Sequence, residues 1–177
     1  MSFLLSRGTT TLADTLYHTR YQTIYRWIAA GFGSGWLPKA PGTWGSIAAL
    51  IPVWAMLYFC SVTSLWIAAA AVTIVGCAVC FALLPTLADK DPGWIVIDEW
   101  AGQWVALALV FAVGSFDWLW FALGFVAFRF FDILKPWPVS WAERAGPAWW
   151  SIMADDLVAG FLGGGALAVI RVLWESA

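Results

Sequence analysis

Five apolar stretches dominate the sequence, each close to the roughly 20 residues that a helix needs to cross the hydrocarbon layer of a bilayer. A chain in lipid must satisfy its own backbone hydrogen bonds, so only helices or closed barrels can span it. The stretches lack the two-residue alternation of barrel strands. We therefore expect an all-α integral membrane protein, a compact bundle of about five transmembrane or partly spanning helices near residues 44–60, 63–84, 94–114, 116–134 and 156–174.

The composition agrees with this interpretation and limits the domain organisation. Sixty-two per cent of the 177 residues are hydrophobic and 11% are charged, which is far from the composition of soluble domains. Asp14, His18, Arg20 and Arg26 interrupt the first apolar residues, a pattern typical of an amphipathic helix at the membrane surface. We expect one membrane-embedded domain over 1–177, with an N-terminal interfacial segment at 1–35 and the helical bundle at 36–175. The net charge of −2 gives no reason to expect nucleic acid.

Basic residues predict the orientation of the bundle. If the N-terminus is cytoplasmic and the five helices alternate in direction, eight of the nine Lys and Arg residues fall on or near the cytoplasmic side, and only Arg171 approaches the other face. An excess of basic residues in cytoplasmic loops is the usual rule. The same alternation brings the acidic groups to that side. The eight basic residues are Arg7, Arg20, Arg26, Lys39, Lys90, Arg129, Lys135 and Arg144.

Two adjacent carboxylates, Asp98 and Glu99, stand where the third span begins. A helix that starts near residue 94 carries them about 6–8 Å into the span at 1.5 Å per residue. Charges at that depth are costly unless they face the bundle interior and find partners, so they indicate a functional site. The fourth and fifth spans contribute Asp132 and the pair Asp155–Asp156 to the same layer.

The charges of this layer favour a bound divalent cation. Five acids face two nearby bases, Arg129 and Lys135. Carboxylates without His or Cys suit Mg²⁺ or Mn²⁺ better than Zn²⁺. Thr43 and Ser46 lie at the start of the first span, where unpaired helix N–H groups could bind an anion. Acids for a metal together with bases and hydroxyls for an anion are what phosphoryl chemistry needs.

The polar residues of this layer lie in four short segments, "APGTWGS" (40–46), "IVIDEWAGQW" (95–104), "FRFFDILKPWPV" (128–139) and "IMADDLVAG" (152–160). Together and in this order, the segments resemble the phosphatidylglycerophosphatase A family of bacterial inner membranes. The resemblance implies a Mg²⁺-dependent lipid phosphatase that removes the terminal phosphate of phosphatidylglycerophosphate to give phosphatidylglycerol. With the orientation above, its active site would face the cytoplasm.

The resemblance and the charge pattern together suggest a role for each polar residue. We expect Asp98, Glu99, Asp155 and Asp156 to bind the metal or to position the attacking water. Arg129 and Lys135 would neutralise the phosphoryl oxygens, and Thr43 and Ser46 would donate hydrogen bonds to them. Asp132 would either bind metal or orient Arg129.

Several other interpretations remain open at this point. Asp98 and Glu99 could form structural ion pairs with Arg129 or Lys135, and Asp155–Asp156 could cap the fifth span. A CDP-alcohol phosphatidyltransferase would also use acids and a divalent metal at the membrane edge. A small ion transporter would likewise bury carboxylates, although near the middle of the membrane. The segment "DKDPG" (89–93) is interpreted as a loop.

Overall fold

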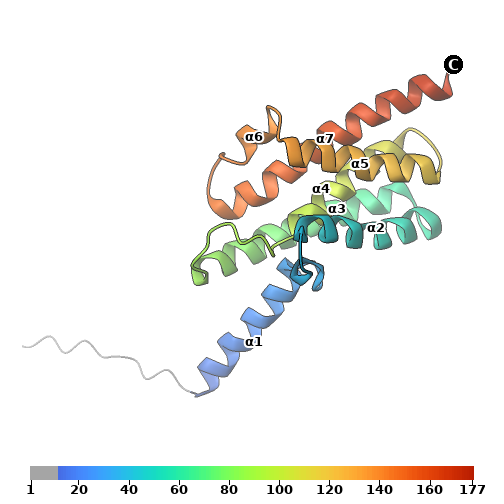
Figure 1. The fold of residues 1–177 in the computed structure, drawn as a ribbon. Coiled ribbons are helices and arrows are strands. Elements are labelled where there is room, and N and C mark those ends of the chain that lie inside the picture. The colour runs from blue at the N-terminus through green and yellow to red at the C-terminus, as the bar shows by residue number, and fades with distance from the viewer. Residues whose placement is uncertain (1–11) are drawn as a thin grey trace, which may run out of the picture.

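The computed structural model describes the backbone of residues 12–177 and the side chains from residue 20 onward. Every regular element in this part of the chain is helical, as predicted. Figure 1 shows a bundle of roughly antiparallel helices from which the first helix projects. The elements are α1 (Leu12–Ala29), η1 (Ser34–Trp36), α2 (Pro41–Phe59), α3 (Val62–Leu83), η2 (Leu84–Thr86), α4 (Ile97–Ala112), α5 (Trp118–Leu134), α6 (Val139–Ala142) and α7 (Ala148–Glu175).

Three of these helical segments are long and apolar enough to cross a membrane: Pro41–Phe59, Val62–Thr86 and Ala148–Glu175. The other two predicted spans, α4 and α5, form helices of 16 and 17 residues. At 1.5 Å per residue these are about 24–26 Å long, somewhat less than a hydrocarbon layer of about 30 Å. Helices therefore form in all five predicted regions, and the number of them that cross the membrane stays a prediction.

The predicted start of the last helix was wrong. It begins at Ala148 and not near residue 156, because Pro147 ends the preceding loop and its carbonyl accepts the N–H groups of Trp150 and Ser151. Trp149 and Trp150 belong to the first turn of this helix. Asp155 and Asp156 therefore lie inside a helix, and the interpretation that they cap it does not hold.

Helix α4 is the centre of the bundle. Thirteen of its 16 residues are buried, and it packs against α2, α3, α5 and α7. Its closest neighbour is α7, where a side chain on Gly160 would collide with the backbone of Gly102. Backbones can approach this closely in membrane helices where both carry small residues. The close approach places the acids of α7 beside those of α4.

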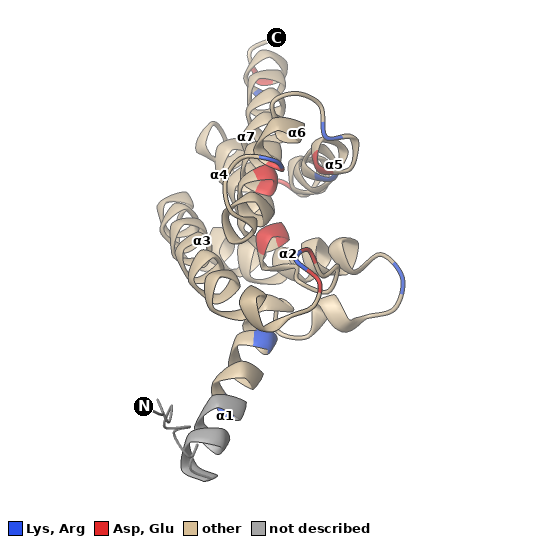
Figure 2. Ribbon diagram, turned by 90° about the vertical axis from the view of Figure 1, so that its left-hand side faces the viewer, with Lys and Arg blue, Asp and Glu red and all other residues tan. Residues whose placement is uncertain are grey.

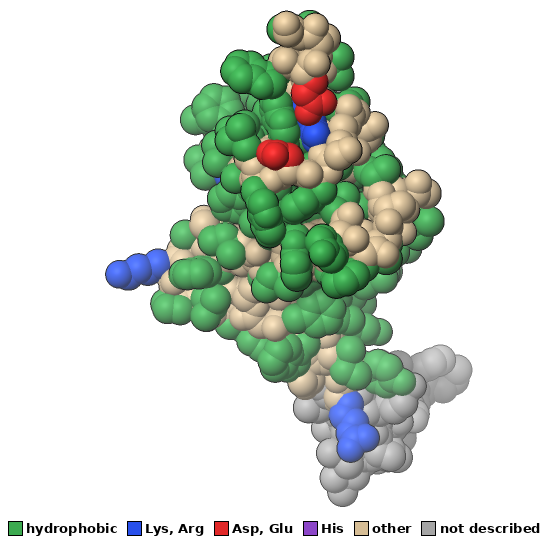
Figure 3. Space-filling model, turned by 90° about the vertical axis from the view of Figure 1, so that its right-hand side faces the viewer, with side chains coloured by type: hydrophobic (Ala, Val, Ile, Leu, Met, Phe, Trp, Pro, Cys, Tyr) green, Lys and Arg blue, Asp and Glu red, His purple; other side chains and the backbone are tan. Residues whose placement is uncertain are grey.

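One end of the bundle carries most of the charge. Figure 2 looks onto this end, where acidic positions of α4, α5 and α7 lie close together. The opposite end, seen in Figure 3, is covered mainly by hydrophobic side chains. The alternating direction of the helices thus gathers the acids at one end of the bundle, as the sequence predicted.

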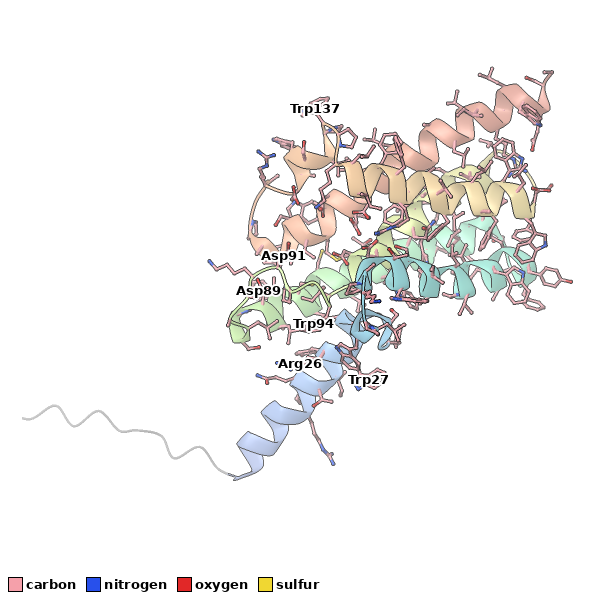
Figure 4. All side chains as sticks on the ribbon, in the orientation of Figure 1. Arg26, Trp27, Asp89, Asp91, Trp94 and Trp137 are labelled. Carbon is pink, nitrogen blue, oxygen red and sulfur yellow. The ribbon has the colours of Figure 1, made fainter. Side chains whose placement is uncertain are left out.

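Helix α1 is continuous from Leu12 to Ala29 and joins the bundle at its C-terminal end. The carbonyl of Ala29 accepts the N–H of Val96, just before α4, at 2.8 Å. Arg26 stacks on the ring of Trp94 at 5.9 Å (Figure 4). The side chains of Asp14 and His18 lie outside the described residues, so an amphipathic α1 at the membrane surface stays a prediction.

Candidate active site

A cavity of about 330 Å³ opens at the charged end of the bundle. Its walls come from the start of α2, the first turn of α4, the end of α5, the first three turns of α7 and two connecting loops. Seven acidic and two basic residues line it: Asp91, Asp98, Glu99, Asp132, Glu143, Asp155, Asp156, Lys90 and Lys135. The charged residues of the cavity are therefore up to 66 positions apart in the chain, from Lys90 to Asp156.

The segment before α4 sets the position of the first two acids. Val96 is the N-cap of α4, so Asp98 and Glu99 fall in its first turn, where acids interact favourably with the helix dipole. An oxygen of Asp98 accepts the N–H of Glu99 at 3.0 Å. Asp98 makes no ion pair among the residues that the structure describes.

Glu99 belongs to a buried ionic network with Arg129. One guanidinium nitrogen of Arg129 contacts Glu99, and it pairs with Asp132 at 2.5 Å, three residues further along α5. The Ser46 hydroxyl lies 2.8 Å from the same Glu99 oxygen and 3.2 Å from Arg129. A side chain on Gly42 would collide with the Glu99 carboxylate, so a larger residue here would displace this carboxylate from its position. The network ties α2, α4 and α5 together at the cavity wall.

Lys135 forms a second ionic network on the other side of the cavity. It is the C-cap of α5, immediately before Pro136, and adopts a left-handed backbone conformation with φ of 44°. Its ammonium group lies 2.8 Å from Asp155 and 2.5 Å from Glu143. Partial burial lowers the pKa of Lys135, but these hydrogen bonds outweigh that effect and hold its pKa above the ordinary value. The lysine is therefore charged at neutral pH.

Some buried carboxylate oxygens have no hydrogen-bond partner within the described part of the chain. They are one oxygen of Asp155 and one of Asp156, and the Arg129 Nε is also unpaired. Buried polar atoms in proteins are nearly always paired, and an exception calls for an explanation. Here the unpaired oxygens belong to acids that line the cavity, so they can bind a group that enters it.

The structure brings together most of the predicted site residues. Six of them line the cavity, and Arg129 and Ser46 lie directly behind its wall. Thr43 does not line it, although its neighbour Gly42 does. The prediction that Thr43 has an unpaired N–H was wrong, because the left-handed conformation of Ala40 lets its carbonyl accept that N–H at 3.0 Å.

Three charged residues of the cavity were not predicted from the sequence: Lys90, Asp91 and Glu143. Lys90 and Asp91 belong to the "DKDPG" segment, which is a loop as predicted but which also covers the cavity. Glu143 follows α6 and pairs with Lys135. A usable signal was present, since both loops join helices at the end of the bundle where the acids gather.

The carboxylates do not converge on one point. In the described part of the chain, no three Asp, Glu, His or Cys side chains lie close enough together to hold a metal ion. The donor set is nevertheless made of hard oxygen ligands, two of which are unpaired. Such a cavity suits an ion that keeps some water or phosphate ligands, as Mg²⁺ does, better than one held in a complete protein cage.

The fold and the cavity together define a helical membrane protein with a buried acidic site at one end of its bundle. The chain matches the family model of phosphatidylglycerophosphatase A over residues 27–171, so it belongs to this family and is a phosphatase. This confirms the resemblance seen in the sequence.

The curated relatives agree with the family match. The chain is 39% identical to phosphatidylglycerophosphatase A of Escherichia coli strain K12 over 147 residues, which is 83% of each chain. It is 39% identical to phosphatidylglycerophosphatase A of Haemophilus influenzae over 132 residues, 75% of this chain and 79% of the relative. A relative from Bacteroides thetaiotaomicron, 38% identical over 81% of this chain and 91% of its own, is named provisionally as a phosphatidylinositol-3-phosphatase. No solved structure matches the chain significantly.

Proposed function

We propose that this phosphatase hydrolyses the terminal phosphate monoester of phosphatidylglycerophosphate, giving phosphatidylglycerol and phosphate. The single observation that carries the proposal is the acid-lined cavity at one end of the bundle, in a chain that belongs to the phosphatidylglycerophosphatase A family. The substrate follows from the names of the relatives in Escherichia coli and Haemophilus influenzae. The positions of the basic residues support a cytoplasmic active site in the bacterial inner membrane.

The depth of the cavity supports a lipid substrate. Helix α7 has 28 residues and is about 42 Å long, some 12 Å more than the hydrocarbon layer. If its C-terminal end reaches the opposite interface, the first eight residues extend beyond the hydrocarbon. Asp155 and Asp156 are the eighth and ninth residues of this helix, so they lie at the boundary where lipid phosphates are found.

The charge of the cavity supports a requirement for Mg²⁺. Arg129 is held by Glu99 and Asp132, and Lys135 by Asp155 and Glu143, so neither cation is available in full to a phosphate. A phosphate monoester would meet a net negative cavity and be repelled. We infer that Asp98, Glu99, Asp155 and Asp156 would bind Mg²⁺ together with water or phosphate ligands, and that the bound ion would polarise the phosphoryl group and lower the pKa of a bound water.

The remaining roles follow from the contacts of each side chain. Arg129 and Ser46 hold the Glu99 carboxylate, and Asp132 holds Arg129. Lys135 orients Asp155 and adds positive charge to the cavity. Thr43 and Ser46 remain proposed phosphate contacts, although the observed contacts of Ser46 make it a positioning residue first. Direct attack by water is the preferred route, and a covalent aspartyl phosphate is the alternative.

The two other function classes have less support. A CDP-alcohol phosphatidyltransferase would also need acids and a metal, but the family match is to a phosphatase. An ion transporter would place its carboxylates near the middle of the bundle. Here the acids lie at one end, in the first turn of α4 and the last turn of α5.

The test is phosphate release from phosphatidylglycerophosphate in detergent micelles by the purified full-length protein, with Mg²⁺ and with EDTA. We expect Mg²⁺-dependent release that is lost in Asp98→Asn. The matched control is Asp89→Asn. Asp89 is an exposed acid in the loop before α4, and it does not line the cavity. Phosphatidic acid and phosphatidylinositol 3-phosphate serve as comparison substrates.

Two results would contradict the proposal. Faster phosphate release from phosphatidylinositol 3-phosphate than from phosphatidylglycerophosphate would contradict the proposed substrate. Undiminished phosphate release in EDTA would contradict the proposed requirement for Mg²⁺.

A further inference from the structure

A second, apolar groove lies beside the acidic cavity. It has a volume of about 530 Å³ and lies between the end of α3, η2 and the start of α7. Volumes of about 300–1,000 Å³ are typical of small-molecule sites. Six hydrophobic residues form most of its wall: Cys80, Phe81, Ala82, Leu84, Pro85 and Trp149. Phe81 and Trp149 touch edge to face across the two helices, with their ring centroids 5.9 Å apart.

The groove and the cavity adjoin each other. Lys90 and Ala148 line both, so the two spaces meet at the loop before α4 and the first residue of α7. Figure 4 labels Asp89 and Asp91, the neighbours of Lys90, in the connection that passes between the end of α3 and the first turns of α7. The apolar groove, Lys90 and the acidic cavity therefore follow one another in space.

This order matches the chemical order of the proposed substrate. Phosphatidylglycerophosphate has two acyl chains on a glycerol, then a phosphodiester, a second glycerol and the terminal phosphate monoester. When the monoester lies in the acidic cavity, the phosphodiester comes next and the acyl chains follow. Lys90, at the junction where the two spaces meet, can bind the phosphodiester, and the groove offers a hydrophobic surface to an acyl chain.

We propose that the groove between α3 and α7 binds an acyl chain of the lipid substrate and that Lys90 binds its phosphodiester. This inference rests on the proposed function, because it assumes that the terminal phosphate enters the cavity. The lipid then enters sideways from the bilayer between α3 and α7.

Lys90 is suited to this role because its charge is uncommitted. Among the described residues it makes no ion pair, whereas Arg129 and Lys135 are each shared between two carboxylates. Its side chain is exposed, and a lysine ammonium is a flexible point charge that can follow a lipid phosphate. A substrate with a phosphodiester gains this contact, and phosphatidic acid, which has none, does not.

Another apolar groove, on α5, provides an internal comparison for the α3–α7 groove. It has about 340 Å³ and is lined by Phe125, Val126, Phe130, Ile133 and Leu134 together with Arg129. None of these residues lines the acidic cavity. Because this groove shares no lining residue with the acidic cavity, we expect that it does not bind the substrate.

The first test compares Ala82→Trp, which fills the α3–α7 groove, with Val126→Trp, which introduces the same residue at an exposed position of the α5 groove. We expect Ala82→Trp to lower kcat/KM on long-chain phosphatidylglycerophosphate by about tenfold or more, since small volume changes in an apolar pocket have effects of that size. The deacylated, water-soluble head group should be hydrolysed equally by both variants. Equal rates of the two variants on the long-chain lipid would overturn the proposal.

Lys90→Gln tests the junction, with Arg144→Gln as the matched control at an exposed base that lines neither space. We expect Lys90→Gln to raise KM on phosphatidylglycerophosphate more than it lowers kcat, and to reduce the preference for this lipid over phosphatidic acid. A loss in kcat alone, or an unchanged preference, would contradict a contact with the diester.

A binding measurement separates this inference from the proposed function. Phosphatidylglycerol with a photoactivatable acyl chain is cross-linked to the wild-type protein in vesicles, and the labelled peptides are mapped by mass spectrometry. Labelling concentrated at 80–85 and 148–150 supports the groove, whether or not the protein hydrolyses phosphatidylglycerophosphate. Labelling spread equally over α5 would overturn the groove even if the phosphatase activity is confirmed.

Discussion

Two arginines, one half-buried and one buried, lie at opposite ends of the bundle, and their surroundings differ in a way that separates structure from function. Arg129 lies at the acidic end and pairs with Glu99 and Asp132. Arg171 lies at the other end and is only 2% exposed.

Arg171 is fully occupied by structural contacts. It donates to the carbonyls of Val110 and Ser115 at 3.3 and 2.6 Å and pairs with Glu175 at 2.8 Å. Its guanidinium stacks on the rings of Phe111 and Trp120 at 5.3 and 5.4 Å. The Val110 carbonyl belongs to the last turn of α4, where helix carbonyls lack partners within the helix. Arg171 therefore caps α4 from a neighbouring helix.

Arg129 is part of a network that is not complete. Its Nε has no partner in the described chain, and two acids beside the network keep an unpaired oxygen. Unpaired buried charge costs stability, so it persists where function requires it. A closed network indicates a structural role, and one with remaining binding capacity indicates a site.

The strongest test of this contrast is Asp156→Asn. We expect kcat to fall by about 10²–10⁴, the range found when a catalytic acid or base is removed. The melting temperature should stay the same or rise, because one of several buried like charges is neutralised. Phosphate release and thermal unfolding in detergent measure the two effects. A melting temperature that falls together with kcat would assign Asp156 a structural role.

A smaller loss of activity is expected from Arg129→Lys, about 10- to 100-fold, as for residues that orient metal ligands. Lysine keeps the charge, but its ammonium group is a compact, strongly hydrated point charge in place of the guanidinium that contacts Glu99 and Asp132 through one nitrogen. Arg171→Lys is the matched substitution at the other end. It should keep the activity of the folded enzyme, and equal kinetic losses in the two variants would remove the distinction between the ends. Steady-state kinetics on the proposed substrate provide the comparison.

The smallest change in activity is expected from Arg171→Gln. This variant leaves backbone carbonyls of α4 and the following loop without their donor, at a cost of about 1–3 kcal/mol for each unsatisfied group. The melting temperature should therefore fall while kcat/KM per folded molecule stays at the wild-type level. The measurement is the activity of this variant well below its melting temperature. A selective loss of kcat would show that the two ends of the bundle are coupled.

Much of the fold could be predicted because the membrane restricts the possible structures. The apolar stretches predicted the regions of all five long helices of the bundle, and alternation placed Asp98, Asp132 and Asp155 at one end. The start of α7 was missed because Trp149 and Trp150 are as compatible with a helix turn as with an interfacial loop. Only the packing of the Pro147–Ala148 segment shows which one forms.

The site was predicted in composition and less well in its connections. Six expected residues line the cavity, but the division of the acids between Arg129 and Lys135 could not be predicted. Ser46 contacts Glu99 from 53 positions away, and Arg129 contacts Ser46 across 83 positions. Lys90, Asp91 and Glu143 were missed because a loop residue has no periodic pattern that shows which way it faces.

The sequence by itself predicted a lipid environment, a helical fold and the end of the bundle where the charged residues gather. These features follow from the length of the apolar stretches and the alternating direction of the helices, which are properties of the chain alone. Only the tertiary structure decided which acids are neutralised and which keep unpaired oxygens. Those outcomes depend on distances of a few ångströms between α2, α4, α5 and α7, set by the close packing of glycines such as Gly42, Gly102 and Gly160. Coulomb energies in a buried site change steeply over such distances.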